Sequence, residues 1–582
     1  MDATPGNRLT LSAIAPRSTA ATTATQSPLL WEIQVPYGHG AFQLLNVFSA
    51  VVAMGNYLLH SEIFLLTAGV MDHWCKRPDS FANLSVDEWK QLAIPIDEHG
   101  QYSHCNVRDP PDGGDEARVV PCASWEYDFS LYGDNIVSHW NLVCDRHWLI
   151  GVARSVYAAA SVVPLAAATL CADSIGRRTA LFITIPVVLI SAVASAMPND
   201  LHFFMAVRAV VSASTSALVP PAIALVVEAS PIEKLAAHIV AISLLSFVLM
   251  PVTMFAAQLA SSGWVAVQLI LMVPTCLLVA LYYTVNESPS WLLVTGNFKE
   301  AERVALRAAY MNGVNVEVCQ ELIAHQIANV KASGCEAPES SGLCCARLRV
   351  RTILVCGMWA ALCYGFDTFI TKDGIPVGDV ATSLSFVLSA VACVAAVPFV
   401  ASYGFRNTVV GSGLGFALTL TTLVATYTKG ALLRDSLVVL MRVAGNVCFT
   451  FFIAMSIKSY PIETHCRGAA AILASSRFGD TLGQMSPVLM GDHCTTLQLA
   501  TAAVLMSLFV VGAEFLPSDA DIWLRHHLAR GSSFGSPSSE GTKRAMFDTL
   551  VPLPKGPVQR RATKMKDRAA LSANTSQATR EK

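Results

Sequence analysis

Long apolar stretches separated by short polar turns dominate the chain. Twelve such stretches can be counted, centred near residues 54, 160, 188, 214, 247, 274, 362, 390, 417, 447, 479 and 506. Each is roughly 20 residues long, which is enough for one helix to cross the hydrocarbon core of a bilayer. The pattern predicts an all-α polytopic membrane protein with twelve transmembrane helices.

The composition agrees with this prediction. Hydrophobic residues make up 53% of the chain and charged residues only 14%, whereas a soluble domain carries about 25% charged residues. The predicted order is a cytoplasmic segment at 1–40, span 1 at 41–68, an extracellular domain at 69–147, spans 2–6 at 148–285, a cytoplasmic central loop at 286–350, spans 7–12 at 351–516, and a basic, disordered cytoplasmic tail at 517–582.

Two short basic turns set the predicted orientation. Asp173–Arg178 follows the second span and Ser402–Asn407 follows the eighth. Short loops rich in Arg and Lys stay in the cytoplasm. Because both turns follow an even number of spans, both termini are expected in the cytoplasm.

The segment after the first span is too long for a simple loop and contains Cys75, Cys105, Cys122 and Cys144. Four cysteines allow three pairings, among which the sequence cannot choose. The oxidising exterior favours disulfides over a metal site. Asn83 begins an Asn-Leu-Ser glycosylation sequon in the same segment. We therefore expect a glycosylated ectodomain held by disulfides.

The two halves of the chain repeat each other weakly. Gly176-Arg177-Arg178 after the second span has a counterpart in Gly404-Phe405-Arg406 after the eighth. Such an internal repeat is typical of carriers built from two six-helix halves, with the binding site between them near the midplane.

Four motifs in the chain resemble those of a known protein family. They are Cys122–Asp128 with Trp140–Asp145, the turn Asp173–Arg178, Asn286–Leu293 (Asn-Glu-Ser-Pro-Ser-Trp-Leu-Leu) and Tyr460-Pro461. Together they resemble the major facilitator superfamily and, within it, the organic cation/anion/zwitterion transporter family of solute carriers. The resemblance implies a multi-pass carrier of small organic ions in the plasma membrane.

The second half departs further from the family pattern than the first. Ser174 and Ser290 replace arginines of the first-half motifs. In the second-half turn Ala401 stands where the family pattern has Asp and Phe405 where it has Arg, and Lys458 stands where Glu precedes Tyr-Pro. Arg406 therefore has no acid near it in the sequence, and we expect a weaker inner contact on this half.

The first-half charges are expected to form a cytoplasmic gate, as the family resemblance implies. Its predicted members are Asp173, Gly176, Arg177, Arg178, Glu228 and Glu287. The alternative is that these charges only cap helix ends and hold loops on the cytoplasmic side.

Charged side chains inside spans are costly and are therefore candidates for function. Arg477 and Asp480 lie deepest, three residues apart on one face of the eleventh span. They are either a self-neutralising structural pair, or Arg477 offers a guanidinium fork to a substrate carboxylate. Arg477 matches an arginine of the family's anion carriers. Tyr364, Asp367 and Glu62 complete the predicted substrate pathway, although Asp367 and Glu62 can also be explained by exposure at the outer surface.

No phosphate-binding loop, catalytic metal spacing or nucleophile motif is found, so neither an enzyme nor a cofactor is predicted. The expected partners are a small organic ion and the lipid bilayer, not a nucleic acid, and the oligomeric state stays open. Arg477 favours organic anions, while Glu62 and Asp367 keep an organic cation or zwitterion as the alternative. The altered second-half motifs leave a third possibility, a non-transporting relative that acts as a sensor or structural protein.

Overall fold

The computed structural model describes residues 36–516 apart from 70, 97–99, 115–116, 130–132, 198–199, 261–262, 271, 333–345, 371–379, 428, 461–463 and 491–494. Most of the predicted N-terminal segment, the whole predicted tail at 517–582 and Pro461 lie outside the described residues. The same holds for the side chain of Glu62, whose backbone belongs to the first helix.

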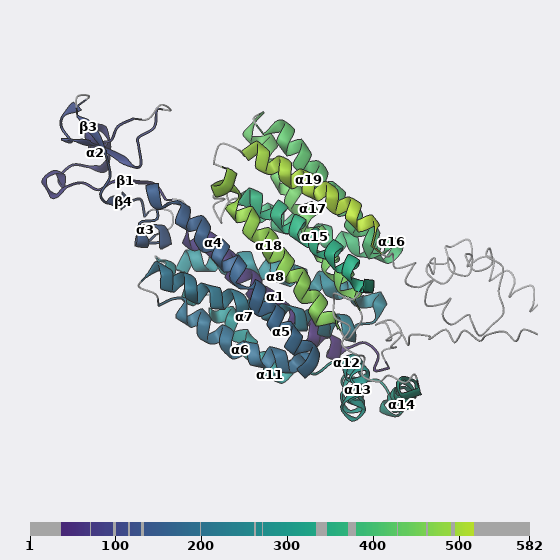
Figure 1. Ribbon diagram of the computed structural model, residues 1–582. Coiled ribbons are helices and arrows are strands. Elements are labelled where there is room, and N and C mark those ends of the chain that lie inside the picture. Colours follow the sequence, from purple (N-terminus) through teal and green to yellow (C-terminus); the bar gives the residue numbers. More distant parts are fainter. Residues whose placement is uncertain are drawn as a thin grey trace, which may run out of the picture.

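The described chain is almost entirely helical, as the apolar pattern predicts (Figure 1). One group consists of α1 (Ala41–Thr67), α4 (Trp148–Ala160), α5 (Val162–Ile175), α6 (Arg177–Ala194), α7 (Leu201–Ala229), α8 (Ile232–Ala260), α9 (Trp264–Ile270), α10 (Met272–Cys276), η5 (Leu277–Ala280) and α11 (Leu281–Thr284). The other consists of α15 (Ala346–Ile370), α16 (Val380–Thr426), α17 (Ala431–Lys458), α18 (His465–Met490) and α19 (Thr495–Glu514).

Nine helical segments of the described residues are long and apolar enough to cross a membrane. One of them, Leu384–Thr426, has 43 residues and is interrupted at Gly404, which has a φ of 83°. Two further long helices, α8 with 29 residues and α18 with 26, are not among the nine. α18 falls short in part because it carries Arg477 and Asp480.

The two helical groups lie side by side, and α18 runs along the boundary between them (Figure 1). α18 packs against α15 of its own group and against α4 and α5 of the other. α16 likewise contacts α8 across the boundary. One continuous set of buried apolar side chains extends through both groups, from Val47 and Met54 on α1 to Phe509 on α19. The boundary is therefore a packed interface.

Residues between α1 and α4 form a separate lobe at one end of the helices, which we call the strand-bearing end (Figure 1). It contains β1 (His73–Cys75), η2 (Asp79–Phe81), α2 (Val86–Ala93), β2 (Asn106–Asp109), β3 (Arg118–Pro121), β4 (Trp125–Tyr127), α3 (Ile136–Trp140) and η4 (Cys144–Arg146). β1 pairs antiparallel with β4, with Trp74 opposite Glu126, and β2 pairs antiparallel with β3.

Two disulfides link parts of this lobe. Cys75 is bonded to Cys122, and Cys105 to Cys144. The sequence left three pairings open, and the strand pairing explains this one, because Cys75 ends β1 and Cys122 lies just before β4. Asn83 is exposed in the turn between η2 and α2, and the sequon serine Ser85 caps α2 through Glu88.

Three short helices lie at the opposite end and follow the motif Asn286–Leu293 (Figure 1). They are α12 (Pro289–Val294), α13 (Phe298–Asn312) and α14 (Val316–Ala332). Asn312 fastens them to the start of α1, since its amide nitrogen donates to Tyr37 O at 2.8 Å and its oxygen accepts from Phe42 N at 3.0 Å. We call this the α12–α14 end.

Candidate gate and substrate site

The turn between α5 and α6 is shaped by Gly176, whose φ of 102° is accessible to glycine but strained for other residues. It brings the first N–H groups of α6 to the carboxylate of Glu287. Arg177 N donates to Glu287 Oε1 at 3.0 Å and Arg178 N donates to Oε2 at 3.1 Å. A helix N-terminus favours an anion in this position, while burial raises the pKa of Glu287. A Cβ atom on residue 176 would collide with Glu287 Oε2.

The guanidinium of Arg177 lies at the centre of a buried ion-pair network. Its Nη2 is 2.9 Å from Glu228 Oε1 and 3.4 Å from Asp173 Oδ1, and all three side chains are fully buried. It also lies over the ring of Trp291, with 5.1 Å between Cζ and the ring centre. Trp291 Nε1 in turn donates to Asp173 O at 3.2 Å. The turn, the end of α7 and α12 thus share one network.

The same acids reach across to the other helical group, where they meet the first turn of α18. Asp173 accepts from Cys466 N at 3.2 Å and from Arg467 N at 2.9 Å, and its Oδ2 is 3.3 Å from Arg467 Nε. Glu228 Oε1 lies 3.2 Å from His465 Nδ1. These bonds join the two groups at the α12–α14 end. Burial raises the pKa of Asp173, which its ion pairs with Arg177 and Arg467 oppose.

The structure therefore brings together five of the predicted gate residues. Gly176 shapes the turn, and the other four meet through their side chains or backbone: Asp173, Arg177, Glu228 and Glu287. Arg178 differs, because its backbone N–H contacts Glu287 while its guanidinium lies over Phe182 at 4.9 Å. Sequence reasoning missed the partners His465, Cys466 and Arg467. Their position just after Tyr460-Pro461, at the start of a span, was the available signal.

The second half has a different contact at the equivalent place. Lys458 Nζ lies 4.8 Å from the ring centre of Phe405, and both side chains are buried. This cation–π pair takes the place that the pair of Arg177 and Glu228 has in the first half. Arg406 has no acid near it in the sequence, but Glu514 at the end of α19 lies 2.8 Å away in space. The two residues are 108 positions apart, so only the packing of α16 against α19 shows the pair.

Arg477 lies in the core of the helical boundary and is 2% exposed. Its Nη1 is 3.3 Å from Ser61 Oγ and 3.4 Å from Asp480 Oδ2. Its Cζ lies 4.3 Å from the ring centre of Tyr57 and 5.7 Å from that of Tyr157. Its Nε and Nη2 are buried, and no hydrogen-bond acceptor is found for them among the described residues.

A second buried arginine lies against the other side of this cluster. Arg208 Nη2 donates to His60 O at 2.7 Å, and its Cζ is 4.4 Å from the ring centre of Tyr157. The sequence analysis did not include it in the substrate pathway. Tyr364 and Asp367 lie on α15, where Tyr364 OH contacts Thr501 Oγ1 at 2.9 Å and Asp367 accepts from Gln484 Nε2 at 3.2 Å.

A narrow cavity adjoins Arg477 at the helical boundary. It encloses about 430 Å³ of space that no atom fills, its open mouth included. Tyr57 on α1 and Pro220 on α7 line one side, and Trp359, Phe449 and Ser476 line the other. Ser476 is the residue before Arg477. The cavity is thus mainly apolar and aromatic, and Tyr57, one of its lining residues, packs against the guanidinium of Arg477.

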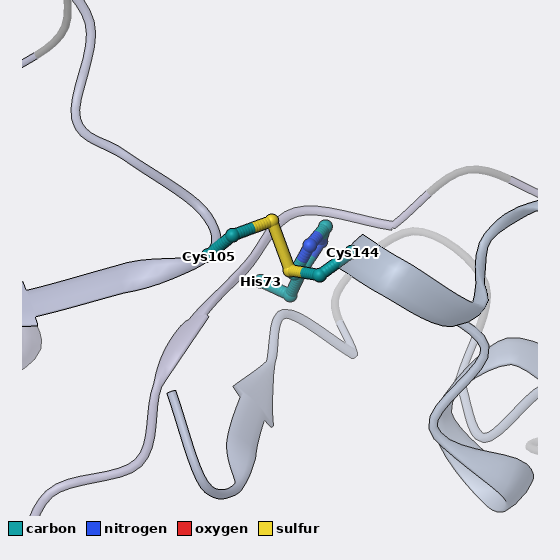
Figure 2. Close-up of side chains that lie close together, drawn as sticks. All are labelled: His73, Cys105 and Cys144. Carbon is teal, nitrogen blue, oxygen red and sulfur yellow. A yellow bond between two sulfur atoms is a disulfide. The ribbon is translucent and has the colours of Figure 1, made fainter. Parts of the chain in front are cut away.

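One cluster in the strand-bearing lobe has the composition of a metal site. Donor atoms of His73, Cys105 and Cys144 lie within 4.8 Å of one another (Figure 2). The sulfurs of Cys105 and Cys144 form a disulfide, so neither is available as a thiolate ligand. The cluster is a disulfide with an imidazole beside it.

Known proteins with similar sequences are membrane transporters. The chain is 24% identical over 501 residues to solute carrier family 22 member 20 of Mus musculus, covering 78% of this chain and 86% of the relative. It is 25% identical over 484 residues to member 7 of the same family from Rattus norvegicus, covering 78% and 89%. The beta-alanine transporter of Drosophila melanogaster is 26% identical over 287 residues, 44% of this chain, and the match spans about half, 47%, of that relative.

Solved structures show the same fold at lower identity. The proton:xylose symporter XylE bound to 6-bromo-6-deoxy-D-glucose superposes with a TM-score of 0.56 at 15% identity, covering 81% of this chain and 96% of that one. XylE from E. coli in a partially occluded inward-open conformation gives 0.52 at 13% identity, covering 82% and 100%. The family profile described as "Sugar (and other) transporter" matches residues 120–475, more than half of the chain. The predicted resemblance is confirmed: the chain belongs to the sugar (and other) transporter family of the major facilitator superfamily and is related to the organic ion carriers of solute carrier family 22.

Proposed function

We propose that this protein is a secondary carrier of small organic ions, with organic anions favoured, that works by alternating access between its two helical groups. Family membership and the names of the relatives support the transporter class. The preference for anions rests on Arg477.

Twelve spans are part of this proposal. Counting the two parts of Leu384–Thr426 separately and adding α8 and α18 to the other candidates gives twelve. The basic turns at the α12–α14 end favour the cytoplasm for that end. Both termini then lie in the cytoplasm of a plasma-membrane protein, and the strand-bearing lobe with Asn83 lies outside.

The proposal of an anionic substrate rests mainly on the guanidinium of Arg477, two of whose nitrogens have no acceptor among the described residues. A buried cation with free N–H donors is costly unless a partner binds it. Among the described residues Asp480 contacts Nη1 and no acceptor is found for Nε or Nη2, which leaves these two nitrogens as a planar pair of donors. That geometry suits a carboxylate, which guanidinium binds with two parallel hydrogen bonds. The neighbouring aromatic wall suits an apolar or aromatic body on the same ion.

The contacts at the α12–α14 end support alternating access. Asp173 and Glu228 belong to one helical group and hold the first turn of α18 in the other. A substrate can leave toward that end only when these bonds break. The described conformation is thus closed at the α12–α14 end, and the network acts as the gate.

Two alternatives have specific support. Asp367 and Asp480 would suit an organic cation or zwitterion, because they lie on α15 and α18, two of the helices that line the cavity. Phe405 and Lys458 stand where the family pattern has Arg and Glu, and they form a cation–π pair in place of an ion pair; this departure supports a relative that no longer transports.

Uptake of labelled organic anions and cations into cells tests the proposal, with surface biotinylation to show that the protein reaches the membrane. Arg477→Ala removes the fork and Arg477→Lys keeps the charge without it. Hydrogen bonds to charged groups contribute about 1.5–3 kcal/mol, so anion KM should rise at least about tenfold in both. Arg303→Ala, an exposed arginine on α13 that pairs with Glu300, serves as the control. Saturable uptake of cations alone would favour the cation or zwitterion carrier. No saturable uptake of either anions or cations would favour the relative that no longer transports.

A further inference from the structure

The imidazole of His465 is fully buried where the two helical groups meet. His465 begins α18, and its Nδ1 lies 3.2 Å from Glu228 Oε1 on α7. Its Nε2 lies 3.0 Å from Tyr460 O. Glu228 is 2% exposed, so neither partner exchanges its contact for water in this conformation. Both ring nitrogens therefore face an oxygen.

Both of these oxygens normally accept hydrogen bonds. A backbone carbonyl has no proton, so Nε2 must carry one and donate it. A carboxylate also only accepts, so Nδ1 must donate too, unless the carboxyl group itself carries the proton. In either case the pair holds one proton more than a neutral imidazole and a free carboxylate would hold.

The surrounding charges balance when this proton is counted. The groups that face the pair are Asp173 on α5, Arg177 on α6, Glu287 before α12, and Cys466 and Arg467 on α18 itself, while Lys458 on α17 contacts the ring of Phe405. Three carboxylates, those of Asp173, Glu228 and Glu287, stand against two guanidinium groups. The shared proton supplies the third positive charge. A buried network without that balance would carry an uncompensated charge, which is strongly destabilising.

Another histidine pair near this end does not cross the boundary. His39 and His238 contact each other at 3.0 Å through their Nε2 atoms, and both belong to the first helical group. Separating the two groups would leave that contact intact. His465 and Glu228, in contrast, lie on opposite sides of the boundary and must part when the gate opens.

We propose that His465 and Glu228 form a proton-binding site, and that closing the α12–α14 end takes up one proton from the solution on that side. The inference rests on the proposed alternating access. The proton is taken up and returned at the same end, so the site makes the gate sensitive to pH there rather than driving transport.

The sign follows from where the proton is bound. The closed state binds one proton more than the open state, so lower pH favours closure. An imidazole in water titrates near pH 6.5. Below about that pH the open state is protonated as well and the advantage of closure is complete. Above it, the ratio of closed to open molecules should fall by up to about tenfold per pH unit, the limit for one proton.

Spin labels at equivalent positions of the two halves can measure this ratio. Thr179→Cys on α6 and Asn407→Cys on α16 are both exposed and follow the two basic turns. The full chain is placed in nanodiscs. Cys171 and Cys276, which are exposed, and the cysteines outside the described residues, Cys335, Cys344, Cys345 and Cys494, are replaced by serine. Pulsed electron paramagnetic resonance then gives the distance distribution from about pH 6 to about pH 8.5, a range that brackets the imidazole value.

Two substitutions remove the titration in opposite ways. His465→Arg keeps the positive charge at every pH, so the closed population should stay high and should not change with pH. His465→Gln is neutral, so the closed population should be low and equally independent of pH. Either variant is sufficient if the other does not fold.

The inference is overturned if the wild-type distribution does not change with pH, or if His465→Arg keeps the wild-type pH response. Distances are measured without substrate, so they are independent of the uptake assay. A pH-dependent distribution in a protein that takes up no ion would support the proton site while rejecting transport. Uptake with pH-independent distances would do the reverse.

Discussion

Replacing Asp173 with alanine should open the α12–α14 end. Asp173 accepts from Cys466 N at 3.2 Å and from Arg467 N at 2.9 Å, two bonds that exist only while α18 lies against α5. Its contact with Arg177 lies within one helical group and persists in both states, so it cancels from the comparison. The substitution therefore acts mainly on the balance between closed and open.

The expected magnitude follows from the two lost bonds. A hydrogen bond to a charged group is worth about 1.5–3 kcal/mol. The ion pair with Arg467 adds about 0–1 kcal/mol, because the Arg467 side chain is 22% exposed. Water can reach part of the freed α18 terminus, so we expect a net loss of about 2–4 kcal/mol in the free energy of closure. At 1.4 kcal/mol per tenfold, the ratio of closed to open molecules should fall by roughly 30-fold to several hundredfold. Asp173→Asn keeps one acceptor oxygen and should lose about half of that free energy.

The spin-label pair Thr179→Cys and Asn407→Cys measures this change as growth of the long-distance population. Asp200→Ala is a matched control. Asp200 also caps a helix with two hydrogen bonds, to His202 N and Phe203 N, but both lie within α7 at the other end of the molecule. The reasoning is refuted if Asp173→Ala leaves the distribution unchanged, or if Asp200→Ala shifts it equally.

Three further outcomes are expected. Gly176→Ala should lower the melting temperature and the closed population, because a residue with a side chain at this φ costs about 1–2 kcal/mol. Its Cβ would also displace the carboxylate of Glu287, which caps α6. A melting temperature and a closed population equal to those of the wild type would contradict this. Arg177→Met should destabilise the protein by about 3–5 kcal/mol, since it removes the central cation from a buried network of acids, whereas Lys458→Met removes a cation–π pair worth about 0.5–2 kcal/mol; equal losses in thermal unfolding would show that the two halves are equivalent. Replacing Cys75 and Cys122 together by serine should cost about 2–5 kcal/mol in the strand-bearing lobe, seen as reduced surface expression, and full expression would argue against a structural role.

Much of the fold could be predicted from the sequence, because a helix that crosses a membrane requires a long run of apolar residues. The basic turns at Gly176 and Gly404 were recognisable for the same reason, since a glycine between charges stands out from its surroundings. α18 was predicted as a span despite Arg477 and Asp480, and it is a helix of 26 residues. Local pattern was therefore sufficient for most elements.

The partners of the gate could not be predicted in the same way. His465 meets Glu228 across 237 residues, and Arg406 meets Glu514 across 108. Such contacts depend on how α7, α16, α18 and α19 pack, which no local spacing encodes. The same is true of Nε and Nη2 of Arg477, because whether a described side chain offers them an acceptor depends on how the helices around them pack.

Anion uptake by wild-type protein and by Arg477→Lys, measured side by side at equal surface expression, tests the central claim most directly. The account predicts saturable uptake of small organic carboxylates by the wild type and at least about a tenfold rise in KM for the lysine variant, which keeps the charge but loses the fork. Identical KM values for the two proteins, or saturable uptake of organic cations alone, would contradict it.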